Sequence, residues 1–319
     1  MKIKETFEQG KGILRLIPVF VPRRFSKAGY RLRLHPDDYY ALGTKRGSIK
    51  ERWFASVITC MNGPLAPADE GLSYVLPFSE KLSEKFTLKE TVDFLGEQIV
   101  GTELMQKYGG WPMYSKFFDF GAPLFHHLHL GFDAAAKVGR LGKPEAYYFP
   151  PEMNNYGGDF PATYFGFDPD VTKDMVRERL LKYEEGDTRI TELSRAYRIQ
   201  LGTGWYTPPG VIHAPGSYLT YEPQWNSDVN SVYENITSNE IYPYEFRTTK
   251  RLISASQFFV LSRMNNSPKS GFLMPTIISE QRNYGLCPDK PLRLRMRLPM
   301  DVLLYKVMGN LEFMMQKLQ

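Results

Sequence analysis

The chain has 319 residues and a formal net charge of +5; 42% of the residues are hydrophobic, 24% are charged and 14% are aromatic. This length and composition indicate a globular protein with a large core, exclude a peptide-scale scaffold and show no motif of nucleic-acid binding. The opening segment lacks the apolar core of a signal peptide and no stretch approaches the roughly 18 apolar residues of a membrane span, so we expect a cytoplasmic protein without a membrane partner.

The frequent aromatic, glycine and proline residues favour strands joined by turns, so we expect a mainly β protein. The first clear helical pattern covers residues 87–109, as one helix or a pair. Thr87 and Glu90 have the spacing of a capping box, and Gly109 and Gly110 should end the segment. The two cysteines, Cys60 and Cys287, are too few for a disulfide framework or a clustered zinc site.

The segment from residue 111 to 130 is rich in β-favouring residues and is interrupted by Gly121 and Pro123, which predicts two strands joined by a turn. Residues 145–149 predict another strand, and residues 150–161 a loop. A second helical insertion is expected over residues 172–197, beginning near Thr172. Residues 205–225 then return to short strands and tight turns.

We expect a soft domain boundary near residues 235–240. Residues 1–235 would form one domain with the two helical insertions, and residues 236–319 a second, β-rich part with a possible last helix in residues 305–319. In that part Arg293, Arg295 and Arg297 alternate with apolar residues, which is typical of a strand with one solvated face.

Three of the five histidines, His126, His127 and His129, fall within four positions of the second predicted strand. Residues two apart on a strand face the same way, so His127 and His129 should share a face while His126 points to the other side. His126 is then expected in the core or behind the ligands, and His35 in a turn.

Glu145 heads the next predicted strand, and His213 follows a Pro-Pro-Gly turn. With His127 and His129 they supply three nitrogens and one oxygen, a ligand set that suits one divalent metal ion, with Zn²⁺ as first choice and Fe²⁺, Mn²⁺ or Ni²⁺ as alternatives. The other interpretation is that these are structural histidines, hydrogen-bonded in an aromatic interior. The clustering in a chain with so few histidines favours the metal site.

Several segments together resemble the type I mannose-6-phosphate isomerase (phosphomannose isomerase) family of the cupin superfamily. A histidine strand followed by a glutamate and a late histidine is the cupin metal motif. The segments that resemble this family more specifically are WPMYSKFFD, GKPEAYYF and TPPGVIHAPGSYLTYEPQWNSD. The resemblance runs from about residue 51 to residue 228, more than half of the chain.

The resemblance implies a cupin fold, a jelly-roll-like double-stranded β-helix, with helical insertions and possibly a second, metal-free cupin half after residue 235. It also implies catalytic roles for Glu222 and Lys143. The chain departs from the family at two positions. His127 stands where the family has glutamine, and Val232 where it has an arginine implicated in catalysis or in binding the substrate phosphate.

These features predict a metal-dependent aldose–ketose isomerase that acts on a sugar phosphate, as in the interconversion of mannose 6-phosphate and fructose 6-phosphate. Arg140 and Lys137 could hold the phosphate in place of the missing arginine, and Trp225 could contact the sugar. Three alternatives remain: a cupin that binds a carbohydrate without turnover, an isomerase of a non-phosphorylated sugar, and a metal-dependent oxygenase. The sequence sets no oligomeric state.

Overall fold

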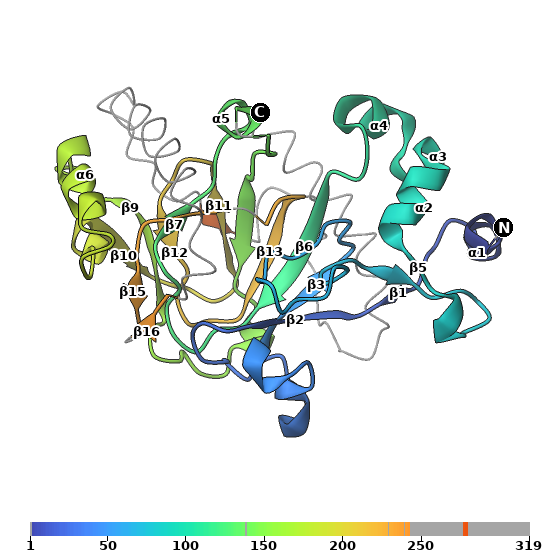
Figure 1. Ribbon diagram of the computed structural model, residues 1–319, viewed down its shortest axis with the longest axis horizontal. Helices are drawn as coiled ribbons and strands as arrows, with labels where there is room; N and C mark the ends of the chain where they lie inside the picture. Colours follow the sequence, from blue (N-terminus) through green and yellow to red (C-terminus); the bar gives the residue numbers. More distant parts are fainter. Residues whose placement is uncertain (1, 138, 229, 239, 243–276, 280–319) are drawn as a thin grey trace.

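Two large antiparallel sheets face each other and enclose the main core (Figure 1). The computed structural model describes residues 2–242, except 138, 229 and 239, and the strand β17 (Ile277–Ser279). Most of the predicted second part, including the basic strand at residues 293–297 and the last helix, lies outside the described residues. The strand β17 pairs with β11 (Thr203–Thr207), so this piece of the second part extends a sheet built from the first.

The seven-stranded sheet has the order β17-β11-β8-β13-β6-β3-β2, and the five-stranded sheet the order β10-β9-β12-β7-β14. The other strands of the first sheet are β2 (Val19–Arg23), β3 (Ser48–Phe54), β6 (Met113–Phe118), β8 (Glu145–Tyr148) and β13 (Thr220–Trp225). The strands of the second are β7 (His127–Leu128), β9 (Ala162–Phe167), β10 (Ser194–Arg198), β12 (His213–Ala214) and β14 (Ser231–Val232).

Aromatic side chains from both sheets form the apolar part of the interior. Phe118 and Tyr147 of the larger sheet meet edge to face with ring centroids 5.8 Å apart, and Trp205 meets Phe165 of the smaller sheet at 5.7 Å. Buried charged side chains also lie on strands of the larger sheet, among them Glu51 of β3, Lys116 of β6, Glu145 of β8 and Glu222 of β13. The interior is therefore apolar in one part and charged in another.

The first helical insertion is confirmed, but as three short helices: α2 (Leu88–Leu95), α3 (Glu97–Val100) and α4 (Thr102–Tyr108). The Thr87 side chain accepts from the Glu90 backbone and the Glu90 carboxylate accepts from the Thr87 backbone, which is the predicted capping box. Gly96 and Gly101 break the segment because they adopt positive φ values of 52° and 89°. Gly109 ends α4 in the left-handed conformation, as predicted.

The second helical prediction, residues 172–197, is wrong at its C-terminal end. The helix α6 (Lys173–Leu181) begins after Thr172, whose side chain accepts from the Met175 backbone. After a turn of 3₁₀ helix at Ile190–Leu193 the chain becomes β10, which pairs with β9. The ladder to β9 satisfies the backbone groups of this segment, so sheet pairing overrides its weak helical pattern.

The remaining elements surround the two sheets. The helices are α1 (Lys2–Gln9) and α5 (Phe132–Ala136), and the minor strands are β1 (Leu16–Ile17), β4 (Tyr74–Val75), β5 (Phe86–Thr87), β15 (Ile236–Thr237) and β16 (Glu240–Ile241). Short 3₁₀ helices lie at Pro36–Tyr40, Thr44–Arg46, Leu82–Glu84 and Pro151–Met153. None of the helices in the described part has the length and apolar content needed to cross a membrane.

A buried ion pair joins β2 to β3. The Arg23 Nε and Nη2 atoms donate to the two carboxylate oxygens of Glu51 at 2.7 and 3.1 Å, and the Trp53 indole donates to Glu51 Oε2 at 2.7 Å. Burial raises the pKa of Glu51, but Arg23 and Lys116 outweigh it and lower this pKa to about 2. A folded-state pKa below the ordinary 4.5 means that Glu51 stabilises the fold above pH 4.5, and that this contribution is lost as the pH falls towards 2.

Replacing Glu51 by glutamine is therefore expected to lower the free energy of unfolding by about 3 kcal/mol at pH 7, because it leaves the buried Arg23 guanidinium with only its longer contact to the Asp228 carboxylate, 3.6 Å away. Urea unfolding at pH 7, 4.5 and 3 measures this, and the difference from the native chain should shrink as the pH falls. Glu8→Gln, at an exposed pair with Lys4, is the control and should cost less than about 1 kcal/mol. An equal loss of stability in the Glu51→Gln and Glu8→Gln variants would contradict a stabilising role for the buried Arg23–Glu51 ion pair.

Candidate metal and active site

Three buried histidines from the five-stranded sheet come together in its interior face. His127 of β7 and His213 of β12 are directly opposite in the strand pairing, and their ring centroids are 4.2 Å apart. His129, just beyond β7, has its ring 5.2 Å from each of them. One ring nitrogen from each histidine lies within 4.8 Å of the others. The structure thus places His127 and His129 on one face, as the alternation predicts, and brings the distant His213 to them.

The hydrogen bonds of two of these rings orient their remaining nitrogens. The Nδ1 atoms of His127 and His213 lie 2.9 Å from the carbonyl oxygens of Phe125 and Val211. A carbonyl only accepts, so each Nδ1 carries the proton and donates it, which leaves Nε2 with its lone pair. Burial lowers the pKa of His127 well below its ordinary value, and burial with the nearby Lys143 ammonium lowers that of His129 to about 4. The His127 and His129 imidazoles are therefore neutral at pH 7, as metal-binding imidazoles must be.

Glu145 reaches the histidines from β8 of the facing sheet. Its Oε2 lies 3.1 Å from His129 Nε2 and its Oε1 lies 3.1 Å from His213 Nε2, while the Tyr147 hydroxyl donates to Oε1 at 2.6 Å. Burial raises the pKa of Glu145, but Lys143 and His129 outweigh it and hold this pKa well below 4.5. The Glu145 carboxylate is therefore ionised, and it faces the neutral His129 imidazole.

The three histidines form a group that can hold a divalent metal ion, and the Glu145 carboxylate lies against two of them. His213 Nε2 and Glu145 Oε2 are buried and, among the described residues, neither makes a well-aligned hydrogen bond despite the short distances around them. Buried polar atoms normally find partners, and these two have lone pairs that converge with those of His127 and His129. Three imidazole nitrogens and one carboxylate oxygen suit Zn²⁺ and the other first-row divalent ions named above.

A buried carboxylate and two lysines lie beside this cluster. The Lys143 ammonium is 3.0 Å from Glu145 Oε2, 3.3 Å from His129 Nε2 and 3.6 Å from Glu222 Oε1. Both the Lys143 and the Glu222 side chains therefore face the interior. Burial, followed by the Glu145 charge, raises the pKa of Glu222 to about 8. A carboxyl group with this pKa can hold and release a proton near neutral pH.

Lys116 completes the charged group, and sequence reasoning did not single it out. It lies opposite Glu222 in the β6–β13 pairing, with its ammonium 3.5 Å from Glu222 and 3.9 Å from Glu51. Burial lowers the pKa of Lys116, but the two carboxylates raise it above its ordinary value, so the side chain stays charged. The sequence did contain a signal for Lys116: it alternates with Tyr114 and Phe118, so it shares their strand face and should be buried with them.

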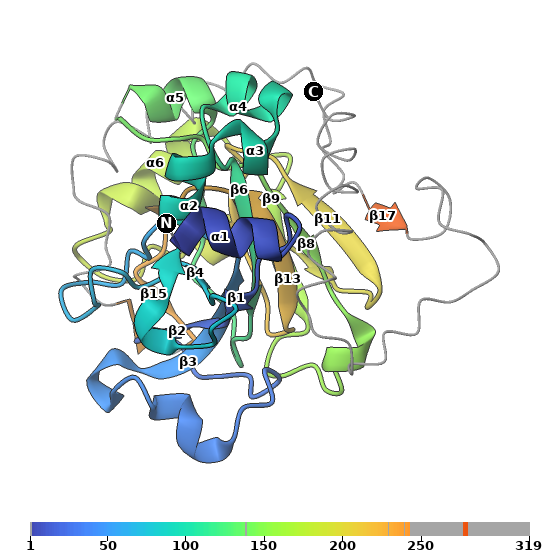
Figure 2. The same ribbon diagram turned by 90° about the vertical axis from the view of Figure 1, so that its right-hand side faces the viewer.

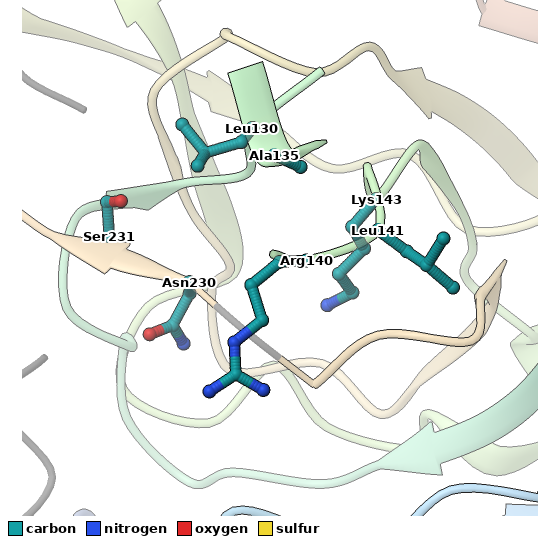
Figure 3. A pocket seen from close by; sticks show the side chains of 7 residues that line it. All are labelled: Leu130, Ala135, Arg140, Leu141, Lys143, Asn230 and Ser231. Atoms are coloured by element: carbon teal, nitrogen blue, oxygen red, sulfur yellow. The ribbon is translucent and has the colours of Figure 1, made fainter. Parts of the chain in front are cut away.

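Arg140 and Lys137 were both predicted to bind a phosphate, and the structure separates them. Arg140 lines a small pocket with Lys143, Asn230 and Ser231, and Figure 3 shows the Arg140 and Lys143 side chains extending to the same side of their loop, with Asn230 beside Arg140. Lys137 follows α5, is exposed and does not line this pocket. Lys143 lines this pocket and also contacts Glu145 and Glu222, so the pocket adjoins the catalytic candidates Lys143 and Glu222.

Val232, at the position where the resemblance leads one to expect an arginine, lies in the apolar core. It pairs with His127 across β14 and β7, is 1% exposed and packs in the aromatic cluster with Phe118 and Phe125. Trp225 is buried at the end of β13, where it lines a different cavity from Arg140. The cations of the Arg140 pocket are therefore Arg140 and Lys143, and neither Val232 nor Trp225 lines it.

The other two histidines lie apart from the cluster. His126 points to the opposite side of β7, where its Nδ1 lies 2.9 Å from Glu234 Oε2 and its backbone N–H donates to the same oxygen at 2.8 Å. His35 is exposed and caps a 3₁₀ turn by accepting from the Asp37 backbone. Both positions agree with the alternation and the turn predicted from the sequence.

Comparisons with known proteins give structural neighbours only. No protein-family model matches the chain, and no curated protein matches it. A structure from Archaeoglobus fulgidus, described as a mannosephosphate isomerase, matches with a TM-score of 0.50 and 20% identity over 69% of this chain and 63% of that one. A variant of phosphomannose isomerase from Salmonella typhimurium matches with a TM-score of 0.51 and 11% identity over 72% of each chain.

The chain spans 63% of the Archaeoglobus protein, less than two thirds of its length. At these identities the likeness establishes the fold. The predicted cupin fold with helical insertions is confirmed, and so is the resemblance to phosphomannose isomerases at the level of fold.

Proposed function

We propose that the protein is a metal-dependent aldose–ketose isomerase that acts on a sugar phosphate, with mannose 6-phosphate and fructose 6-phosphate as the first pair to test. The observation that carries the proposal is the convergence of His127, His129, His213 and Glu145 next to the buried Glu222 and Lys143. A structural histidine cluster would not need a second carboxylate and an ammonium at its edge. The shared fold with phosphomannose isomerases supports this choice of reaction.

His127, His129, His213 and Glu145 would hold the ion. When bound, a divalent ion supplies Lewis acidity to the sugar oxygens and offsets their developing negative charge. Zn²⁺ is the first choice because the donor set is three nitrogens and one carboxylate oxygen. We also propose that the protein is cytoplasmic and that residues 236–319 form a second part of the chain. Neither nucleic acid nor a membrane is a proposed partner.

Glu222 and Lys143 would move the protons of the reaction. The Glu222 carboxylate takes the proton from C2 of the aldose, and the electron pair forms the C1–C2 double bond as O1 accepts a proton from Lys143. The resulting cis-enediol then returns a proton from O2 to Lys143 as the C2 carbonyl forms, and Glu222 delivers its proton to C1. One hydrogen has moved from C2 to C1 and one from O2 to O1, so both side chains end as they began.

Arg140 would bind the phosphate of the substrate, since a guanidinium forms charge-assisted hydrogen bonds to phosphate oxygens. Replacing Arg140 by alanine is expected to raise KM for the phosphorylated sugar by roughly 10- to 100-fold with little change in kcat, because binding to a remote phosphate acts on ground state and transition state alike. Steady-state kinetics measure both constants. Lys137→Ala is the matched control on the same loop and should change KM less than about twofold. If KM rises equally in both variants, Lys137 also binds the phosphate.

The direct test is interconversion of mannose 6-phosphate and fructose 6-phosphate by the Zn²⁺-loaded protein, with a chelated sample as control. Metal-dependent turnover supports the proposal. The second candidate is a cupin that binds a carbohydrate without turnover, and the apolar setting of Val232 favours it. Absence of turnover of phosphorylated and free hexoses, in protein shown to contain the metal, would select that candidate.

A further inference from the structure

A second cavity lies between α2 and α4 on one side and α5 on the other. It has a volume of about 420 Å³ and is lined by Val92, Tyr108, Trp111, Phe132, Trp225 and Asn226, among others. Both α4 and α5 lie at the same end of the molecule, at the top in Figures 1 and 2. Ligand pockets commonly have volumes of about 300–1,000 Å³, so this groove can hold a small molecule.

Aromatic rings form the walls of the groove. The Trp225 ring lies between those of Tyr108 and Phe132, with centroids 4.8 and 5.3 Å away and both contacts edge to face. Phe132 is 48% exposed and the adjoining Leu141 is 59% exposed. Large apolar side chains that meet at one exposed site mark a binding surface more often than single exposed ones do.

Polar atoms without partners lie in the same wall. The Nε1 atoms of Trp225 and Trp111 and the Oδ1 atom of Asn226 are buried and have no hydrogen-bond partner in the part of the chain that the structure describes. Trp225 as a whole is only 8% exposed. These atoms lie beneath the surface of the wall, so a ligand in the groove meets the aromatic rings first and reaches the buried atoms only after the wall shifts. A hydroxyl group can then pair with either kind of atom, because it both donates and accepts.

The charges at the rim favour a neutral ligand. The Lys89 ammonium and the Asp93 carboxylate lie 2.6 Å apart and neutralise each other, and the Lys107 ammonium lies 5.1 Å from the centroid of the Tyr108 ring. The groove therefore has aromatic walls and a nearly balanced rim. This distinguishes it from the Arg140 pocket, which presents a cation for an anionic group.

We infer that this groove binds a neutral pyranose ring, and that it holds a second sugar residue of a substrate larger than a hexose phosphate. The inference rests on the proposed function for its choice of a sugar. Leu141 lines both this groove and the Arg140 pocket, and the Trp225 backbone N–H donates to the carbonyl of Pro144, between Lys143 and Glu145. A reducing-end aldose at the metal site keeps C1 and C2 free, so the next residue can extend into the groove through a later hydroxyl.

The test uses the full chain after chelation and a methyl α-mannopyranoside probe, whose blocked anomeric carbon prevents isomerisation. NMR titration gives Kd for the native chain and three variants. Phe132→Ala and Trp225→Phe should each weaken binding by about 3- to 10-fold, the first by removing a ring and the second by removing the Nε1 donor. Phe94→Ala is the matched control, since Phe94 is 46% exposed on α2 but does not line the groove, and its Kd should not change.

Equal Kd values in all four proteins, or no saturable binding by the native chain, would overturn the inference. So would tighter binding of adenosine than of the glycoside, since the groove would then prefer a planar base. Failure of the proposed function is measured separately, as absence of sugar-phosphate turnover in metal-loaded protein. Groove binding without turnover would leave the sugar subsite standing while the isomerase proposal falls.

Discussion

Replacing Glu222 by glutamine is expected to lower kcat by roughly 100- to 10,000-fold while the metal content stays unchanged. The amide has nearly the same shape as the carboxyl group but cannot accept the C2 proton. Glu222 is not grouped with the three histidines; its neighbours in the cluster are Lys143, 3.6 Å away, and Glu145. Steady-state kinetics and metal analysis of the same preparation measure the two quantities.

The loss should also appear as a loss of isotope exchange. If Glu222 carries the proton between C2 and C1, incorporation of deuterium from heavy water into the substrate should fall together with kcat. A slow isomerase with full exchange would indicate that another group removes the proton and that Glu222 acts later. A fully active variant would rule out Glu222 as the base.

Glu234→Gln is the matched control for this change. Glu234 is also a buried carboxylate, but it lies on the other side of β7, where it accepts from the His126 backbone and from the Thr191 hydroxyl. A glutamine there keeps one oxygen for His126 and an amide group that can donate to the Thr191 hydroxyl. Its kcat should stay within about threefold of the native value, since a weakened hydrogen bond on the far side of β7 costs stability and not chemistry.

Local sequence signals predicted the parts of the fold that local physics determines. The capping box of Thr87 and Glu90 sets the start of α2 because both partners lie within one turn. Alternation along a strand placed His127 and His129 on one face and His126 on the other, and this needs only the geometry of an extended chain. The breaks at Gly96 and Gly101 were not predicted, because only Gly109 and Gly110 were expected to end this segment.

Long-range pairing determined the rest. β10 forms a strand because it pairs with β9, and the residues of β10 alone do not indicate this partner. His213 reaches His127 only through the β7–β12 pairing. It was predicted as a ligand because histidines are few and it follows a Pro-Pro-Gly turn, but no local signal gave the strand pairing that brings it to the cluster. Lys116 was missed for the same reason, because its partner Glu222 lies more than a hundred positions away on β13.

Replacing His213 by asparagine is expected to weaken metal binding by at least about 100-fold and to abolish metal-dependent turnover. Loss of a residue that merely supports a ligand already costs about 10- to 100-fold, and this change removes a ligand candidate itself. The asparagine amide can still donate to the Val211 carbonyl in place of Nδ1, so the loop keeps its hydrogen bond while the Nε2 atom is lost. Metal stoichiometry after dialysis, with circular dichroism to check the fold, measures the effect.

His126→Asn is the matched control, because it keeps a donor at the Nδ1 position for Glu234 and removes an Nε2 atom that faces away from the cluster. Both variants lose the same ring from the same small sheet, so they carry a similar packing cost. A metal site predicts full metal content in His126→Asn and little in His213→Asn. If the histidines are only structural, both variants should lose stability and both should have the same metal content as the native chain. The interior cluster would then have no catalytic role.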